Sequence, residues 1–134
     1  MQSKERLAII GTGHIRIYNA AINELLYEQH NDIQEFAKEA MTKLLYGELE
    51  YAPSHIEALY MGVGLKKKAI FRRELTGVNE VEFAVLFEPV DFDSSFDELN
   101  LHCENHGIFS IATGVAASKS SSESLLVTWT ITIA

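Results

Sequence analysis

The chain has a single cysteine and no long apolar run. Cys103 has no second cysteine to pair with among 134 residues, so an intramolecular disulfide is excluded. The apolar run at residues 7–10 is interrupted at once by Gly11, which makes it too short for a signal-peptide core or a membrane span. These absences predict a cytoplasmic protein that needs no oxidising compartment and does not enter a membrane.

Positive charge is also scarce. Lys and Arg together number 11 against 19 Asp and Glu, which gives a formal net charge of −8. Long-range repulsion then opposes approach to nucleic acid or to an anionic membrane. The one basic run, at residues 66–68 with Arg72 and Arg73 after it, is interpreted as a solvated face instead of a phosphate groove. Nucleic acid is not an expected partner.

Apolar residues make up 47% of the chain and charged residues 22%, a composition typical of globular proteins. A chain of this length can bury a core without metals or disulfides. We therefore expect one domain over residues 1–134.

The clearest pattern is the alternation over residues 125–134. Side chains on a β-strand point to opposite faces with period two. One face would hold Leu125, Val127, Trp129, Ile131 and Ile133. The other holds threonine at positions 128, 130 and 132. This segment is predicted to be a strand with one buried face, whereas its threonine face could meet water, a ligand or a second subunit.

Three further strands are expected upstream. Val81, Phe83, Val85 and Phe87 alternate with polar or small residues, and the turn-like residues 76–79 join this segment to a strand over 67–75. Residues 65–69 could also be helical. A strand over 108–117 is followed by a serine-rich loop at 118–124, and would form a second hairpin with the final strand.

Helical spacing predicts the remaining elements. Apolar residues from Ile15 to Leu26 recur every three or four positions and indicate a helix over 15–30, and a broader apolar stripe indicates a second helix over 32–46 that ends at Gly47. Capping-box patterns beginning at Ser54 and Ser95 predict short helices over 54–63 and 95–106. The expected fold is α+β, with N-terminal helices packed on one face of a mostly antiparallel sheet of about four strands, in the order ααα-ββ-α-ββ.

Gly11 and Gly13 match the first two glycines of a dinucleotide-binding turn. Arg16 occupies the third glycine position, and Asp32 begins a helical pattern instead of ending a strand. Nucleotide binding is therefore not predicted. The pattern leaves open whether residues 7–13 are strand or helix.

The densest group of reactive side chains is His102, Cys103 and His106. On a helix these residues would lie within one turn of each other, and imidazole and thiolate are zinc ligands. A third or fourth ligand at suitable spacing is missing, so no metal and no other cofactor is predicted. Cys103 is interpreted as a partly buried residue, and whether it is reactive stays open.

Glu80, Glu82 and Glu88 could serve in acid or base catalysis, but charges on the exposed side of an edge strand explain them more simply. No completed catalytic motif occurs, and no catalytic residue is predicted. The leading hypothesis is a small acidic interaction or accessory protein without catalytic activity, whose partner is itself, as a homodimer, or another protein.

The alternative hypothesis is a small-molecule-binding protein or an enzyme with a pocket between the sheet and the helices. Trp129 would line that pocket, and His102 and His106 would be its polar anchors.

Overall fold

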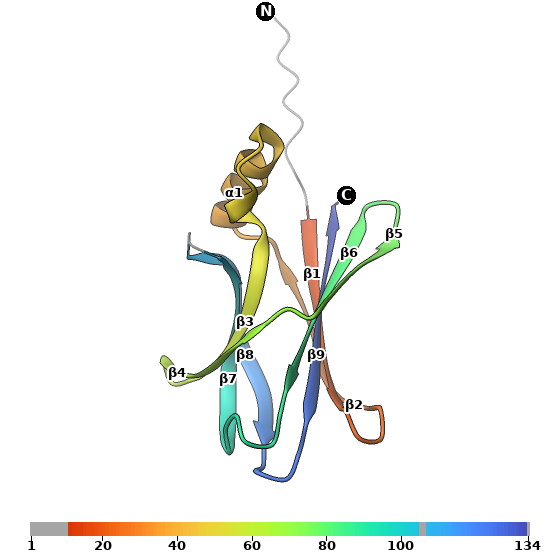
Figure 1. Cartoon of the computed structure of the whole chain (residues 1–134), viewed down its shortest axis with the longest axis vertical. Coiled ribbons are helices and arrows are strands. Elements are labelled where there is room, and N and C mark those ends of the chain that lie inside the picture. Colours follow the sequence, from red (N-terminus) through yellow and green to blue (C-terminus); the bar gives the residue numbers. More distant parts are fainter. Residues whose placement is uncertain (1–10, 105–106, 134) are drawn as a thin grey trace, which may run out of the picture.

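Two antiparallel sheets face each other and an α-helix lies at one end of them (Figure 1). The computed structural model describes residues 11–104 and 107–133. Sheet A has the strand order β2-β1-β9-β6-β5, and sheet B has the order β4-β3-β7-β8. The elements are β1 (Gly11–Asn19), β2 (Glu24–Asp32), α1 (Glu35–Tyr46), a 3-10 turn η1 (Leu49–Tyr51), β3 (Pro53–Tyr60), β4 (Val63–Ala69), β5 (Arg72–Gly77), β6 (Glu80–Phe87), β7 (Ser94–Cys103), β8 (Ile108–Lys119) and β9 (Leu125–Ile133).

Strand β9 lies at the centre of sheet A and confirms the predicted strand, but Thr128 and Thr130 on its other face are also buried, at 3% and 7% exposed. It pairs with β1 on one side and with β6 on the other, so that Trp129 lies between Ile15 and Phe83. Leu125, Val127 and Trp129 are completely buried. The alternating face seen in the sequence is therefore the part of sheet A that packs into the core between the sheets.

The predicted α+β fold is wrong, because most of the expected helices are strands. Residues 15–30 form the hairpin of β1 and β2. Ile15 and Ile17 are both completely buried, which is the period-two pattern of a strand, and Ile22 is 65% exposed although helical spacing placed it on the buried face. Asn23 adopts a positive φ of 55° at the turn, a conformation that interrupts a right-handed helix.

The two predicted short helices, over 54–63 and 95–106, are also wrong and correspond to β3 and β7. In β3 Ile56 and Ala58 are buried, and in β7 Leu99, Leu101 and Cys103 are buried, so both segments show alternation. β3 and β7 pair with each other in the middle of sheet B. Capping-box residues matched helix starts by spacing alone, while pairing with a neighbouring strand decided the local structure.

Helix α1 is the helix that the apolar stripe predicted, although it begins at Glu35 instead of residue 32. Ala37 and Ala40 are its buried residues, and the helix packs against β8. Gly47 adopts a left-handed conformation with φ of 108°, and its N–H donates to the carbonyl of Leu44. The predicted helix end is thus confirmed.

The segment over 67–75, predicted to be one strand, is divided between two strands that belong to different sheets. β4 is an edge strand of sheet B, and after Ile70 and Phe71 the chain continues as β5, an edge strand of sheet A. The backbone N–H of Ile70 donates to Ser54 in β3, and that of Phe71 donates to Ala84 in β6. The predicted turn at 76–79 is confirmed as the connection of β5 to β6.

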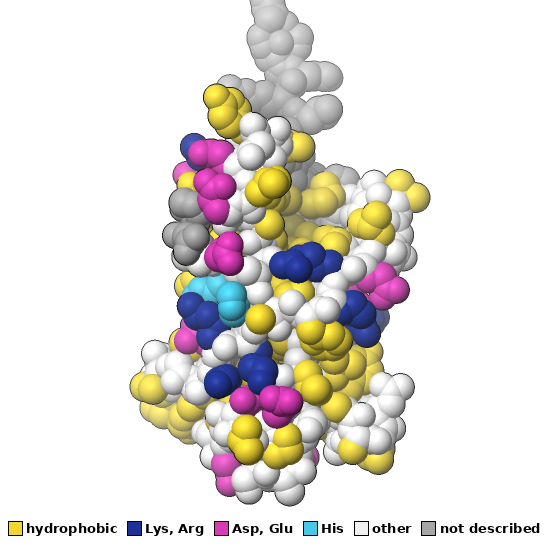
Figure 2. Space-filling view, viewed as in Figure 1, with side chains coloured by type: hydrophobic (Ala, Val, Ile, Leu, Met, Phe, Trp, Pro, Cys, Tyr) yellow, Lys and Arg dark blue, Asp and Glu magenta, His cyan; other side chains and the backbone are white. Residues whose placement is uncertain are grey.

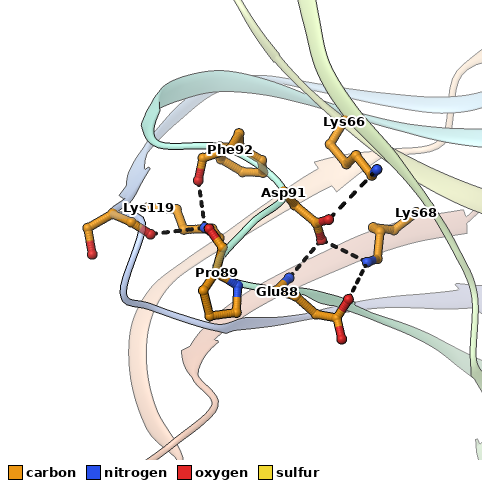
Figure 3. A network of polar contacts seen from close by, with 8 residues as sticks. Lys66, Lys68, Glu88, Pro89, Asp91, Phe92 and Lys119 are labelled. Atoms are coloured by element: carbon orange, nitrogen blue, oxygen red, sulfur yellow. Dashed lines mark hydrogen bonds and ion pairs between the residues drawn. The ribbon is translucent and has the colours of Figure 1, made fainter.

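The predicted second hairpin is wrong, because β8 belongs to sheet B and β9 to sheet A. The serine-rich loop between them crosses from one sheet to the other. Close to it, the loop joining β6 to β7 is held from two sides (Figure 3). On one side Lys119 is only 1% exposed, and its Nζ donates to the carbonyls of Pro89, Phe92 and Ser120 at 2.9, 2.6 and 2.9 Å.

On the other side of this loop, Asp91 accepts a hydrogen bond from the backbone and forms ion pairs with two lysines. Its carboxylate lies 2.8 Å from Nζ of Lys68 and 3.7 Å from Nζ of Lys66, and it accepts the backbone N–H of Glu88 at 2.7 Å. The side chain of Asp91 is 4% exposed. Burial acts to raise the pKa of Asp91, but the hydrogen bonds from Lys68 and from the Glu88 backbone outweigh it and leave the pKa below its usual value.

Candidate functional site

Trp129 and His102, two of the three residues predicted to line a pocket, do not come together. Trp129 projects from sheet A into the core and is completely buried. His102 is on β7 of sheet B, where its Nε2 lies 2.9 Å from Oε1 of Glu57. His106 lies outside the described residues. A pocket that uses both Trp129 and His102 is not formed, because one side chain is enclosed between the sheets and the other pairs with Glu57 of the neighbouring strand.

The close approach of Trp129, and not a nucleotide, explains why position 13 is a glycine. A Cβ atom at Gly13 would lie 3.2 Å from Nε1 of Trp129 and 3.1 Å from Nδ2 of Asn31, and one at Gly11 would overlap the side chain of Ile33. Both glycines are part of β1, which is followed by a turn and another strand. The strand-to-helix turn that a dinucleotide needs is therefore not present in this described segment.

Cys103 is buried, and its Sγ donates to the carbonyl of Tyr51 at 3.1 Å. Burial raises the pKa of the thiol, which disfavours the thiolate needed by a nucleophile or a metal ligand. Among residues 11–104 and 107–133, histidine, cysteine, aspartate and glutamate form no group of three that could hold a metal ion. Cys103 therefore has the position of a structural residue.

The threonine face of β9 is part of a polar surface on the outside of sheet A. Register places Thr130 between His14 of β1 and Glu82 of β6, and Thr132 opposite Glu80. These side chains border a depression of about 240 Å³. Because Arg16 and His14 of β1 and two glutamates of β6 flank the threonines, this is not the weakly polar face that would favour packing against a second subunit.

The glutamates of this surface each have a partner of their own. The hydroxyls of Thr76 and Thr132 both donate to Glu80 at 2.8 Å, and they lower the pKa of that carboxyl. Glu82 accepts from Arg72 at 3.1 Å. Glu88 follows the end of β6 and pairs with Lys68. The three carboxylates are therefore held in separate interactions and do not form an acid–base pair.

A cleft with a predominantly apolar lining opens at the helix end of the molecule. Figure 2 shows hydrophobic side chains gathered in the hollow between α1 and the β5–β6 hairpin. The cleft has a volume of about 370 Å³. Its lining comes from both sheets and the helix: Met41, Leu44, Pro53, Leu75, Val78, Asn79, Glu80, Val81, Phe83, Phe109, Ile131 and Ile133.

The packing of α1 explains why this cleft exists. The helix buries the small residues Ala37 and Ala40, whereas Met41 and Leu44 are only partly buried and line the cleft. On the opposite wall Leu75 and Val78 are 81% and 101% exposed. The end of sheet A is thus only partly covered by the helix, and large apolar groups remain in contact with solvent.

More exposed apolar residues follow the cleft along α1. Leu45 and Tyr46 at the end of the helix are 87% and 86% exposed, and Leu49 in η1 is 74% exposed. Large exposed apolar residues beside an apolar cleft are typical of binding sites for proteins or apolar ligands. In the sequence, the apolar residues Leu75 and Val78 in and beside a turn are the signal that indicates this surface.

None of the helices in the described part of the chain is long and apolar enough to cross a membrane. Comparison with protein-family models, with curated proteins and with solved structures finds no match for the chain.

Proposed function

We propose that this protein is an interaction protein without catalytic activity that acts as a homodimer. The observation that carries the proposal is the apolar cleft at the helix end, together with the exposed side chains on its wall, Leu75 and Val78. Leaving large apolar groups in water is unfavourable by roughly 25 cal/mol for each Å² that a partner could cover. A surface of this kind favours association over an isolated chain.

The chemistry of the other surfaces supports a binding role over catalysis. The carboxylates Glu80 and Glu82 are each held by neighbouring hydroxyl or guanidinium groups, and burial raises the pKa of the Cys103 thiol. A general base or a nucleophile needs a free group with a suitable pKa beside a binding site. The apolar cleft offers contact area instead.

Sedimentation of the full chain over a concentration series tests the proposal. We expect a monomer–dimer equilibrium in the wild type and a shift to monomer in the double variant Leu75→Asp, Val78→Asp, because two carboxylates would have to be desolvated on association. Both residues are exposed, so the variant should keep its fold, which circular dichroism checks. Val90→Asp is the matched control, since Val90 is 89% exposed in the β6–β7 loop and does not line the cleft.

A wild type that stays monomeric at every concentration would overturn the homodimer. If such a monomer also bound an apolar dye that Val81→Trp displaces from the cleft, the protein would instead be a small-molecule-binding protein.

A further inference from the structure

Strand β5 is the least protected edge of the two sheets. It pairs with β6 on one side and ends the strand order of sheet A on the other, and each of its six residues is exposed. Unpaired N–H and C=O groups of such an edge are a template for another strand. One wall of the apolar cleft, at Leu75, belongs to this same strand.

The other three edges carry features that oppose strand addition. β2 and β8 face each other across the side of the sandwich, and side chains from the β2 side donate to β8: Gln29 to the carbonyl of Thr113 at 2.9 Å, and Gln34, just after β2, to that of Ile111 at 2.8 Å. In β4, Lys66 and Lys68 pair with Asp91, whereas Lys67 is an exposed lysine on this edge strand. Lysine is a common protection of exposed edges against pairing.

The two arginines of β5 do not give it the same protection, because both are turned toward their own subunit. Nη2 of Arg72 lies 3.1 Å from Oε1 of Glu82 on the outer face of sheet A. Nη2 of Arg73 donates to the carbonyl of Pro53 in sheet B at 2.7 Å, on the inner face. The backbone edge between them is left uncovered.

We infer that β5 pairs antiparallel with β5 of a second copy, about a two-fold axis at Arg73, and that this pairing forms the homodimer. A two-fold axis perpendicular to the sheet leaves the outer face of one strand continuous with the outer face of the other. Side chains alternate between the faces, so two residues that lie opposite each other are either both even-numbered or both odd-numbered. With the axis at Arg73, Arg72 is opposite Glu74 of the second copy, and this pair occurs twice. The strand is therefore complementary to itself in charge.

The same register, continued to Phe71 just before β5, also brings apolar residues together. Phe71, whose N–H already bonds to Ala84 of β6, is opposite Leu75 of the second copy, again twice. Phe71 and Leu75 are 60% and 81% exposed in the single chain. The central Arg73 side chains point to their own Pro53 carbonyls, so the like charges are directed away from each other. Moving the axis to Glu74 would instead oppose two glutamates on the outer face.

This inference rests on the proposed homodimer and specifies the surface that forms it. Charge reversal on β5 tests it with the full chain. In Glu74→Arg, both cross-strand pairs become Arg–Arg, and in Arg72→Glu both become Glu–Glu. Each variant alone should weaken dimerisation by roughly tenfold or more, because attraction is replaced by repulsion at two positions. An equimolar mixture of the two variants should recover dimers, since every pair is again Arg–Glu.

Glu24→Arg on β2 is the control for net charge, because Glu24 is exposed on a different edge of sheet A and should leave the dimer unchanged. Recovery on mixing is a result that misfolding of either variant could not produce. A wild-type dimer that Glu74→Arg does not weaken, or variants whose mixture stays monomeric, would overturn pairing through β5 and leave the proposed homodimer in place. A monomeric wild type would overturn both.

Discussion

The two ends of the sandwich are closed by different kinds of interaction. At the end of the β6–β7 loop, Lys119 and Asp91 hold the backbone from opposite sides with directional polar contacts (Figure 3). At the other end α1 covers the sheets through the small residues Ala37 and Ala40, and the apolar cleft remains beside it. At the polar end, hydrogen bonds hold the loop in one conformation. At the helix end, α1 covers the sheets only in part and leaves apolar surface that another molecule can bury.

The largest expected effect is at the polar end. In Lys119→Met the carbonyls of Pro89, Phe92 and Ser120 lose their shared donor inside a buried site. We expect the free energy of unfolding to fall by about 3 kcal/mol, as measured by urea denaturation. Lys67→Met is the control, because Lys67 is exposed in β4 and should change stability by no more than about 0.5 kcal/mol. Equal losses of unfolding free energy in both variants would mean that the buried Lys119 ammonium group does not stabilise the β6–β7 loop.

A smaller effect is expected from adding volume near each end of β6. Val85 is completely buried, so Val85→Leu should overpack the core and lower the free energy of unfolding by about 1–3 kcal/mol. Val81 lines the cleft and is only partly buried, so Val81→Leu should be neutral or stabilising by up to about 1 kcal/mol. Thermal or urea denaturation measures both. A Val81→Leu variant as unstable as Val85→Leu would show that the helix end is packed as tightly as the core around Val85.

The smallest effect concerns the pH dependence of the polar end. Because the folded pKa of Asp91 is below its usual value, its contribution to stability is present at neutral pH and is lost as pH falls through the folded pKa. Asp91→Asn should therefore be less stable than the wild type by about 1 kcal/mol at pH 7, where the contacts with Lys66 and Lys68 are intact.

The difference between Asp91→Asn and the wild type should shrink toward zero in strong acid, where Asp91 is protonated. Urea denaturation at several pH values measures it. A difference that stays constant down to the lowest pH would show that the charge of Asp91 does not contribute.

Local patterns were sufficient where one residue type or one period decided the structure. The alternation from Leu125 to Ile133 identified β9 and its buried face, and Gly47 marked the end of α1. Both signals are local, since side-chain direction and a left-handed φ depend on the residue itself and its immediate neighbours.

The errors have a common physical cause. Spacing from Ile15 to Leu26 fits a helix as well as a hairpin, and Ser54 with Glu57 fits a helix start, but pairing with β9 and β7 made these segments strands. The pairings of β1 with β9 and of β3 with β7 join residues far apart in sequence, so no local window of the sequence contains them. Likewise, the cleft depends on how α1 meets β5, β6 and β9, so none of its segments shows it alone.

The sequence by itself determined the alternating final strand, the helix that ends at Gly47, and the acidic charge balance, although three other segments that it assigned to helices are strands. Only the tertiary structure decided that Trp129 is enclosed instead of lining a pocket, that Arg16 and two glutamates flank the threonine face, and that β5 is an edge strand. The reason is that a strand defines its two faces by alternation, whereas the neighbours of each face and edge are set by contacts between distant segments.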